Sequence, residues 1–221
     1  MALPINGVVG GSASATAGTN PSNLALRIGS TAELIVDDLH GRYYESTVRK
    51  QMFTAGVSTL IATATTASPT TTITGAQVLY NPIGNTNNVV INKVSLGFVL
   101  ASVAGVVGIA TGFNAGTAIS GTLTTTTATP KNKFLGSTAP TAQSYASASI
   151  TLPTAVTLDT ILFNTGSLAT TGYATQPSTV YDFEGSIILP PGGYATIWSN
   201  FIIPASSLLS TFQWEEVSTT I

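Results

Sequence analysis

From residue 53 onward, runs of β-branched and aromatic residues alternate with turn-forming residues. The runs recur at intervals of roughly ten residues, the strand spacing of a sandwich or barrel rather than of a helical fold. The segments between them are rich in Pro, Gly, Asn and Thr, which favour turns and loops. The candidate strands are 58–65, 75–81, 88–101, 106–113, 147–152, 157–166, 181–189, 194–201 and 210–217. Their number is close to the eight strands of a jelly roll, so the sequence predicts an all-β fold, a jelly-roll-like antiparallel β-sandwich with an extended N-terminal arm.

The clearest local signal is a tight turn at residues 190–193, where two prolines precede two glycines. Proline fixes φ at the entry of a turn and glycine tolerates a positive φ, so this order predicts a strand, a tight reversal and a second strand. Further along, Phe212 and Trp214 alternate with polar residues, which places both aromatic side chains on one face of a strand. We interpret them, with Trp198 and Phe201, as core residues. A carbohydrate-stacking platform and a contact between subunits are the alternatives.

Charged residues are scarce, at 7% of the chain against about 25% in an average soluble domain. Half of them lie between Arg27 and Lys50, and residues 1–26 have none. A segment with this composition cannot bury enough apolar surface to offset the entropy of ordering its backbone. The sequence therefore predicts a flexible N-terminal arm (1–26), a charged connecting segment that could hold a docking element (27–52) and a sandwich body (53–221).

The first two of these segments leave alternatives open. Ser30 stands three residues before Glu33, as in a capping box, and Gly41 could end a short helix that starts there. Residues 33–37 fit a strand equally well. The arm fits either a disordered tail or a segment that becomes ordered against another subunit, and its first residues lack the positive charge of a secretory signal.

Residues 94–113 carry no charge and are long enough to span a membrane as a helix. However, Lys93 is the only basic flank, no belt of Trp or Tyr brackets the segment, and glycines interrupt it. We therefore interpret it as two buried strands that meet near Gly105 and Gly108, where glycine allows a bend or a close backbone approach. The sequence predicts no membrane partner.

The residue types needed for most catalytic sites are missing. The chain has no cysteine and a single histidine, His40, which we interpret as a structural, hydrogen-bonded residue. It contains no nucleophile elbow, phosphate-binding loop or dinucleotide-binding fingerprint. The net charge of -2 is too small and of the wrong sign to neutralise a row of phosphates. We therefore predict no enzymatic activity, no catalytic residues, no cofactor, no metal site and no nucleic-acid partner.

Three close carboxylate pairs bear on this prediction: Asp37 with Asp38, Glu215 with Glu216, and Asp182 with Glu184. Neighbours in a strand point to opposite faces, so only Asp182 and Glu184 could share one. A glycosidase needs two carboxyl groups at least about 5 Å apart beside sugar-binding aromatics. A hard cation needs several oxygen ligands. We interpret all three pairs as solvated or interface charges.

The best candidate for a docking contact is the block that begins LHGRYYE. Tyr and Arg are enriched at the energetic centres of protein interfaces. The interface candidates are Arg42, Tyr43, Tyr44, Glu45 and Arg49.

Five blocks, in order, resemble a family of small virion structural proteins of tailed bacteriophages, over about residues 27–217: LHGRYYESTVRKQMFTAG, VLYNPIGNTNNVVINKVSLGFV, TPKNKFLGS, LPPGGYATIWSN and FQWEEV. The likeness lies in the order of the blocks and includes no catalytic motif. It implies a capsid decoration or cement protein whose jelly-roll body forms a homotrimer. The implied partners are the major capsid protein and further copies of the chain, and the implied location is the outer surface of the capsid in the virion.

Two other functions remain open at this stage. The second hypothesis is a tail- or fibre-associated adhesion domain that binds host-surface glycan through Thr-rich loops and aromatics such as Tyr173 and Tyr181. The third is a phage hydrolase that uses Glu184, which the small number of ionisable groups disfavours.

Overall fold

The computed structural model describes residues 42–57, 71–98, 105–121, 129–146, 149–165, 179–201 and 208–219. The chain divides into two compact units, residues 1–42 and residues 43–221. The second unit therefore begins at Tyr43, before the predicted boundary at 53, because the segment leading into the first strand belongs to it. The predicted arm, the helix or strand predicted between Ser30 and Gly41, His40 and the candidate strand 58–65 lie outside the described residues.

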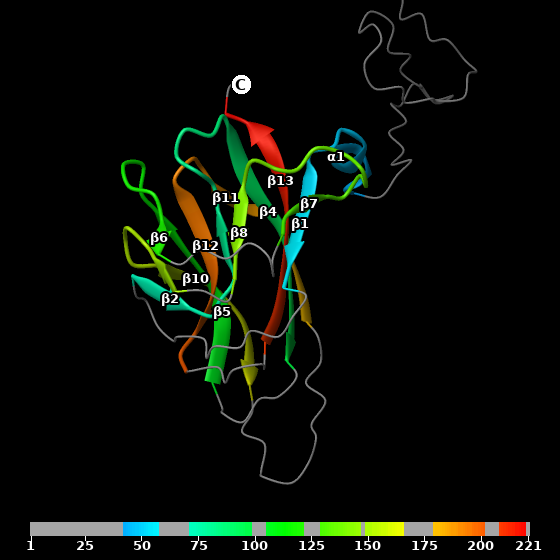
Figure 1. Ribbon diagram of the computed structural model, residues 1–221. Helices are drawn as coiled ribbons and strands as arrows, with labels where there is room; N and C mark the ends of the chain where they lie inside the picture. Colours follow the sequence, from blue (N-terminus) through cyan, green and yellow to red (C-terminus); the bar gives the residue numbers. More distant parts are fainter. Residues whose placement is uncertain are drawn as a thin grey trace, which may run out of the picture. The chain divides into compact units, whose positions relative to one another are not determined.

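The described part of the body consists of one short helix and a series of antiparallel strands (Figure 1). The elements are α1 (Tyr44–Val48), β1 (Met52–Gly56), β2 (Thr72–Thr74), β3 (Val78–Tyr80), β4 (Asn87–Phe98), β5 (Gly105–Phe113), β6 (Ser120–Gly121), β7 (Lys131–Asn132), β8 (Gln143–Tyr145), β9 (Ser149–Thr151), β10 (Thr157–Thr165), β11 (Thr179–Leu189), β12 (Gly193–Ser199) and β13 (Leu208–Ser218). Every strand pairing in this part of the chain is antiparallel.

Two five-stranded sheets pack face to face as a sandwich. The first has the strand order β11-β4-β13-β1-β7, and the second has the order β10-β5-β12-β3-β8. A third, three-stranded sheet, β2-β9-β6, lies beside the second. The predicted all-β, antiparallel sandwich is confirmed.

The long strands pair in a nested way. The first long strand, β1, pairs with the last, β13, and β3 pairs with β12. Inside these pairs, β4 pairs with β11 and β5 pairs with β10.

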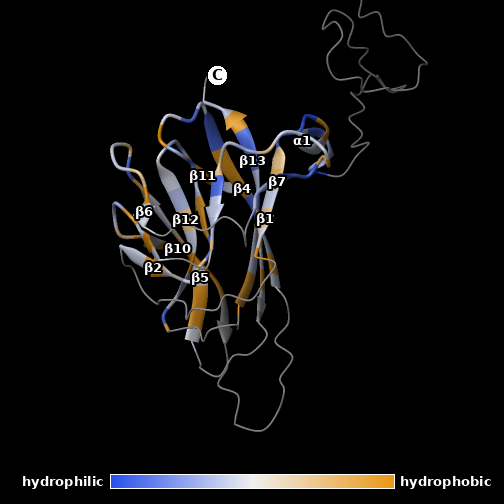
Figure 2. Ribbon diagram, in the orientation of Figure 1, coloured by the Kyte–Doolittle hydropathy of each residue, from blue (hydrophilic) through white to orange (hydrophobic). Residues whose placement is uncertain are grey.

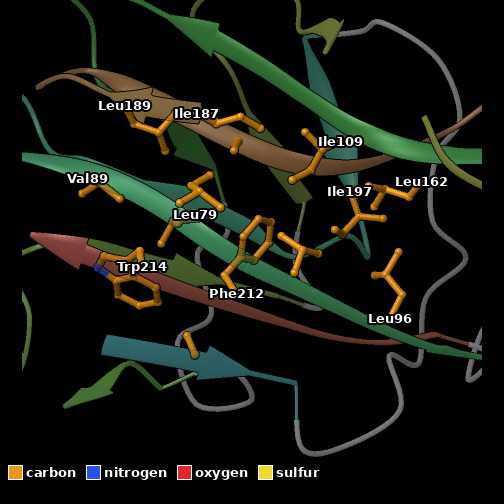
Figure 3. Packing of buried hydrophobic residues seen from close by; sticks show 14 of the residues in the cluster. Leu79, Val89, Leu96, Ile109, Leu162, Ile187, Leu189, Ile197, Phe212 and Trp214 are labelled. Carbon is orange, nitrogen blue, oxygen red and sulfur yellow. The ribbon is translucent and has the colours of Figure 1, made fainter. Parts of the chain in front are cut away.

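The main core lies between the two five-stranded sheets and consists of side chains from both inner faces (Figure 3). Burial along β13 alternates residue by residue, and Phe212 and Trp214 are both fully buried, as their spacing in the sequence predicts. Phe201 is also buried, and Trp198 is partly buried against a second core under the third sheet. The prediction that these four aromatics pack in cores is confirmed. Figure 2 shows the hydrophobic stretches along the long strands.

The uncharged segment 94–113 forms the end of β4 and all of β5, so the prediction of two strands is confirmed. The two strands belong to opposite sheets. Strand β5 begins at Gly105, as predicted, and continues through Gly108, so the strands do not meet at Gly108. The close backbone approach is present: a Cβ at Gly108 would lie 2.5 Å from the carbonyl oxygen of Thr160 on β10. In the part of the chain that the structure describes, no helix is long and apolar enough to cross a membrane.

The turn at residues 190–193 has the predicted geometry. The amide of Gly193 donates to the carbonyl of Pro190 at 2.7 Å, and Gly192 has a φ of +90°. The strands on either side of the turn belong to different sheets, so the turn carries the chain from one layer of the sandwich to the other. Asn81 holds it in place, because its carbonyl accepts from the amide of Gly192 at 2.8 Å and its side chain donates to the carbonyl of Leu189 at 2.9 Å.

Candidate docking surface at helix α1

Helix α1 is a single turn with well-defined ends. Tyr43 precedes it, and its carbonyl accepts from both the amide and the hydroxyl of Thr47, at 3.0 and 2.7 Å. At the other end, Lys50 adopts a left-handed φ of 63°. The amide of Lys50 donates to the carbonyl of Thr47 and that of Gln51 to the carbonyl of Ser46, each at 2.9 Å. These two bonds form a Schellman motif, which ends the helix although no glycine is present.

The side chain of Tyr43 ties this helix to the first sheet. Its hydroxyl donates to Asp182 Oδ1 on β11 at 2.6 Å. The ammonium of Lys93 on β4 lies 4.7 Å from the centroid of the Tyr43 ring and 3.5 Å from Asp182 Oδ2. The hydrogen bond from Tyr43, followed by the amide of Glu184 and the charge of Lys93, holds the pKa of Asp182 below its ordinary value. We therefore assign Tyr43 an internal, anchoring role.

The other predicted interface residues point outward. Tyr44 is 46% exposed, and Arg42, the first described residue, is also exposed. Glu45 and Arg49 are exposed and pair with each other, with 2.8 Å between Oε1 and Nε. The helix buries none of its own residues, so packing in the core does not account for its defined conformation. That these residues and Tyr43 contact a partner stays a prediction.

Sequence reasoning missed a second exposed cluster, next to α1. Lys131, Lys133, Phe134 and Leu135 lie on β7 and in the turn that follows it, and Leu135 is 80% exposed. The ammonium of Lys50 lies 5.6 Å from the centroid of the Phe134 ring. We call these five residues the basic edge. The signal in the sequence was KNKFLGS, in which two lysines and two large apolar residues precede a turn glycine.

Of the three carboxylate pairs, Asp37 and Asp38 lie outside the described residues. Asp182 and Glu184 are both exposed in the alternating pattern of β11, and Asp182 Oδ1 accepts from the amide of Glu184 at 3.0 Å, beside a large bulge that separates Asp182 from Ile187. Among the described residues, no group of three or more His, Asp or Glu side chains could hold a metal ion.

Glu216 corrects the interpretation of its pair as solvated or interface charges. Glu215 is half-exposed, but Glu216 points to the opposite face and is buried. Its carboxylate accepts from the hydroxyl of Thr141 at 2.6 Å and from the amide of Ala142 at 2.8 Å. Glu216 therefore fixes the segment that leads into β8 to the end of β13.

The role of Tyr43 can be tested through the titration of Asp182. Replacing Tyr43 by Phe removes the main cause of the lowered pKa, so we expect the pKa of Asp182 to rise toward its ordinary value, measured by NMR titration of the carboxyl group. The lowered pKa of Asp182 stabilises the folded state at pH values above the ordinary pKa of 3.8, and this stabilisation is lost as the pH falls through the lower pKa of the folded state. Tyr43→Phe should therefore make the free energy of unfolding depend less on pH in this acidic range. Tyr44→Phe, the same change at an exposed tyrosine, is the control. An unchanged pKa in Tyr43→Phe would contradict the anchoring role.

In comparisons with known proteins, no family model, no curated protein and no solved structure matches this chain. The assignment of a function therefore depends on its own residues.

Proposed function

We propose that this chain is a non-enzymatic structural protein of a bacteriophage virion. In this proposal it is a capsid decoration or cement protein that binds the outer surface of the shell as a homotrimer and stabilises the shell. Its partners are the major capsid protein and further copies of itself, and it needs no cofactor. The observation that carries the proposal is helix α1, a rigidly anchored turn that buries none of its own residues and presents Tyr44, Glu45 and Arg49 outward.

The anchoring of α1 supports a role in binding. A contact surface that is already ordered before binding loses less conformational entropy when its partner docks. Tyr43 and the Schellman motif supply this order, so Tyr44 and Arg49 can be presented in a fixed arrangement. Tyr and Arg are also the residue types that dominate interface energetics. In a trimer, three such surfaces would engage the shell together, so that modest individual contacts give firm attachment.

The burial of the large aromatic residues favours this proposal over glycan binding. Phe212 and Trp214 are fully buried and cannot stack on a sugar ring. The hydroxyl of Tyr181 donates to the carbonyl of Leu162 on β10, so its polar end is already engaged within the chain. Tyr173, the other aromatic of the adhesion hypothesis, lies outside the described residues.

The proposal is tested by measuring how many copies of the chain remain on purified capsids. We expect Tyr44→Ala to weaken attachment about tenfold or more, the usual loss when an aromatic residue at the centre of an interface is truncated. Phe113→Ala is the matched control, because Phe113 is an exposed aromatic (52%) on β5. Electron microscopy of the virion then locates the chain.

If the two variants occupied capsids equally, the result would contradict a role of α1 in the interface with the shell. If the chain lay on a tail fibre and bound host glycan, the adhesion hypothesis would replace the decoration protein. If it were found on no virion, both would fail.

A further inference from the structure

The basic edge gathers positive charge at one corner of the first sheet. Four of the seven Lys and Arg residues of the chain lie there: Arg49, Lys50, Lys131 and Lys133. Arg49 pairs with Glu45. In the residues that the structure describes, no carboxylate lies within ion-pair distance of Lys50, Lys131 or Lys133. The attraction of these three ammonium groups for negative charge is therefore available to another molecule.

Side-chain contacts join the end of α1 to β7 and to the turn that follows it (Figure 1). The side-chain amide of Asn132 on β7 donates to the carbonyl of Lys50 at 2.7 Å. The ammonium of Lys50 lies 5.6 Å from the centroid of the Phe134 ring, in the turn after β7. Lys50 and this turn therefore belong to one surface, although they are far apart in the sequence.

Lys131 and Lys133 point to the same face of the first sheet. Lys131 lies opposite Thr54 in the register of β7 and β1. The amide of Lys133 donates to the carbonyl of Met52 on β1 at 2.8 Å. Phe53, between these two partners, points into the main core. Side chains alternate along a strand and residues in register share a face, so both lysines point outward, away from the core.

The turn after β7 is ordered by hydrogen bonds of its own. The amide of Ser137 donates to the carbonyl of Phe134 at 3.1 Å, and Gly136 supplies a positive φ of 82°. The amide of Phe134 donates to Asn132 Oδ1 at 2.8 Å. Leu135, in the middle of this turn, is 80% exposed. An exposed leucine on an ordered turn favours a role in binding, because covering it costs little conformational entropy.

We propose that the basic edge binds an acidic segment of a protein partner, one in which large apolar side chains accompany the carboxylates. The three lysines bind the carboxylates, and Phe134 and Leu135 pack on the apolar side chains. The inference rests on the proposed function in one respect, since there the acidic segment belongs to the shell that the chain decorates. It adds to the proposed contact at α1 the charge and the chemical class of the partner.

Two other anionic partners fit this surface less well. Nucleic acid is held by a row of phosphate contacts. The basic edge has three unpaired cations next to the carboxylate of Glu45, and the apolar side chains of Phe134 and Leu135 would have no partner on a phosphate backbone. An anionic membrane surface is bound by clusters of about four to eight basic residues or by an amphipathic helix. A mixed charged and apolar surface is typical of a contact between proteins.

The inference is tested by titrating the full-length, isotope-labelled chain with a soluble peptide of repeated Glu-Glu-Leu and recording two-dimensional NMR spectra. We expect the amide signals of Lys50 and of residues 131–136 to shift. Screening weakens contacts between exposed charges, so the affinity should fall about tenfold between about 50 mM and about 500 mM salt. A peptide of repeated Lys-Lys-Leu is the control for charge and should not shift these signals.

Variants of the chain make the test specific. Lys131→Glu with Lys133→Glu should weaken binding of the Glu-Glu-Leu peptide about tenfold or more, whereas Lys131→Arg with Lys133→Arg keeps the charge and should bind like wild type. Leu135→Ser should weaken binding about threefold or more, because it removes apolar contact area. Ile161→Ser is the matched control, since Ile161 is an exposed apolar residue (57%) on β10. These side chains are all exposed, and the NMR spectra show whether each variant folds.

Three results of the titration would each overturn the inference: no binding of the Glu-Glu-Leu peptide, shifts that lie away from the basic edge, and full binding by the doubly reversed chain. Two competing probes are titrated in the same way, vesicles of phosphatidylcholine with phosphatidylserine and a thymidine oligonucleotide. If either shifted the signals of the basic edge at a lower concentration than the peptide, a membrane or a nucleic acid would replace the acidic protein segment.

The outcome is separable from that of the proposed function. A chain that binds the acidic peptide as described and is found on no virion would keep this inference and remove the decoration role. A chain that decorates capsids equally well with and without the reversal of Lys131 and Lys133 would do the opposite.

Discussion

Replacing Trp214 by alanine should lower the free energy of unfolding by about 3–5 kcal/mol, the usual cost of removing a large aromatic residue from a core. Trp214 is fully buried between the two five-stranded sheets, and its ring lies 6.1 Å from that of Phe53 on the neighbouring strand β1. Truncation would leave a cavity on the inner face of the central strand β13, which pairs on both sides. The loss is measured by unfolding in urea, monitored by far-UV circular dichroism because this signal does not depend on the fluorescence of Trp214.

Two further variants identify the source of this loss. Val217→Ala removes an exposed side chain from the same strand and should change the free energy of unfolding by less than about 0.5 kcal/mol. Trp214→Phe retains much of the buried ring and removes an indole N–H that has no hydrogen-bond partner among the described residues, so it should cost clearly less than Trp214→Ala. If Trp214→Ala lowered the free energy of unfolding no more than Val217→Ala, the result would contradict the packing of Trp214 in this core.

Replacing Gly192 by alanine should cost about 2–5 kcal/mol, for two separate reasons. A left-handed backbone costs an L-residue with a side chain about 1–2 kcal/mol, and Gly192 has a φ of +90°. In addition, a Cβ there would lie 2.4 Å from the carbonyl oxygen of Asn114, so the backbone on one side must move, which adds about 1–3 kcal/mol.

Gly84 provides a matched control for this substitution. It has a φ of +83°, and a Cβ there would meet no atom within 4 Å. Gly84→Ala should therefore lose only the free energy that the left-handed backbone costs. The difference between the two variants in free energy of unfolding then measures the steric contact with Asn114. Equal losses in urea unfolding would show that the turn between the two sheets is free to shift.

Much of the strand content was predictable because it depends on residues that are close in sequence. The alternation in β13 places Phe212 and Trp214 on the buried face. Side chains of a strand alternate between its two faces, whatever strands lie beside it. The turn at 190–193 was predictable for the same reason, since proline and glycine restrict the backbone locally. Strands of two or three residues, such as β7 and β8, were missed because so short a segment has no measurable period.

The candidate docking residues were predicted only in part. The composition of the block pointed to Tyr43 and Tyr44 alike, and only the fold shows that Tyr43 also anchors the helix to the first sheet. Tyr43 bonds Asp182, which is 139 positions away in the chain, and nothing near either residue in the sequence records that contact. The basic edge was missed because Lys50 and Phe134 become neighbours only when β1 pairs with β7.

The sequence by itself determined the all-β class, the positions of most long strands, the turn chemistry and the shortage of catalytic groups, since these follow from residue type and short-range periodicity. The tertiary structure decided which strands pair, that the turn at 190–193 joins two sheets and that Glu216 is buried. The physical reason is that pairing and burial depend on the free energy of the whole packed body, to which residues far apart in the chain contribute together.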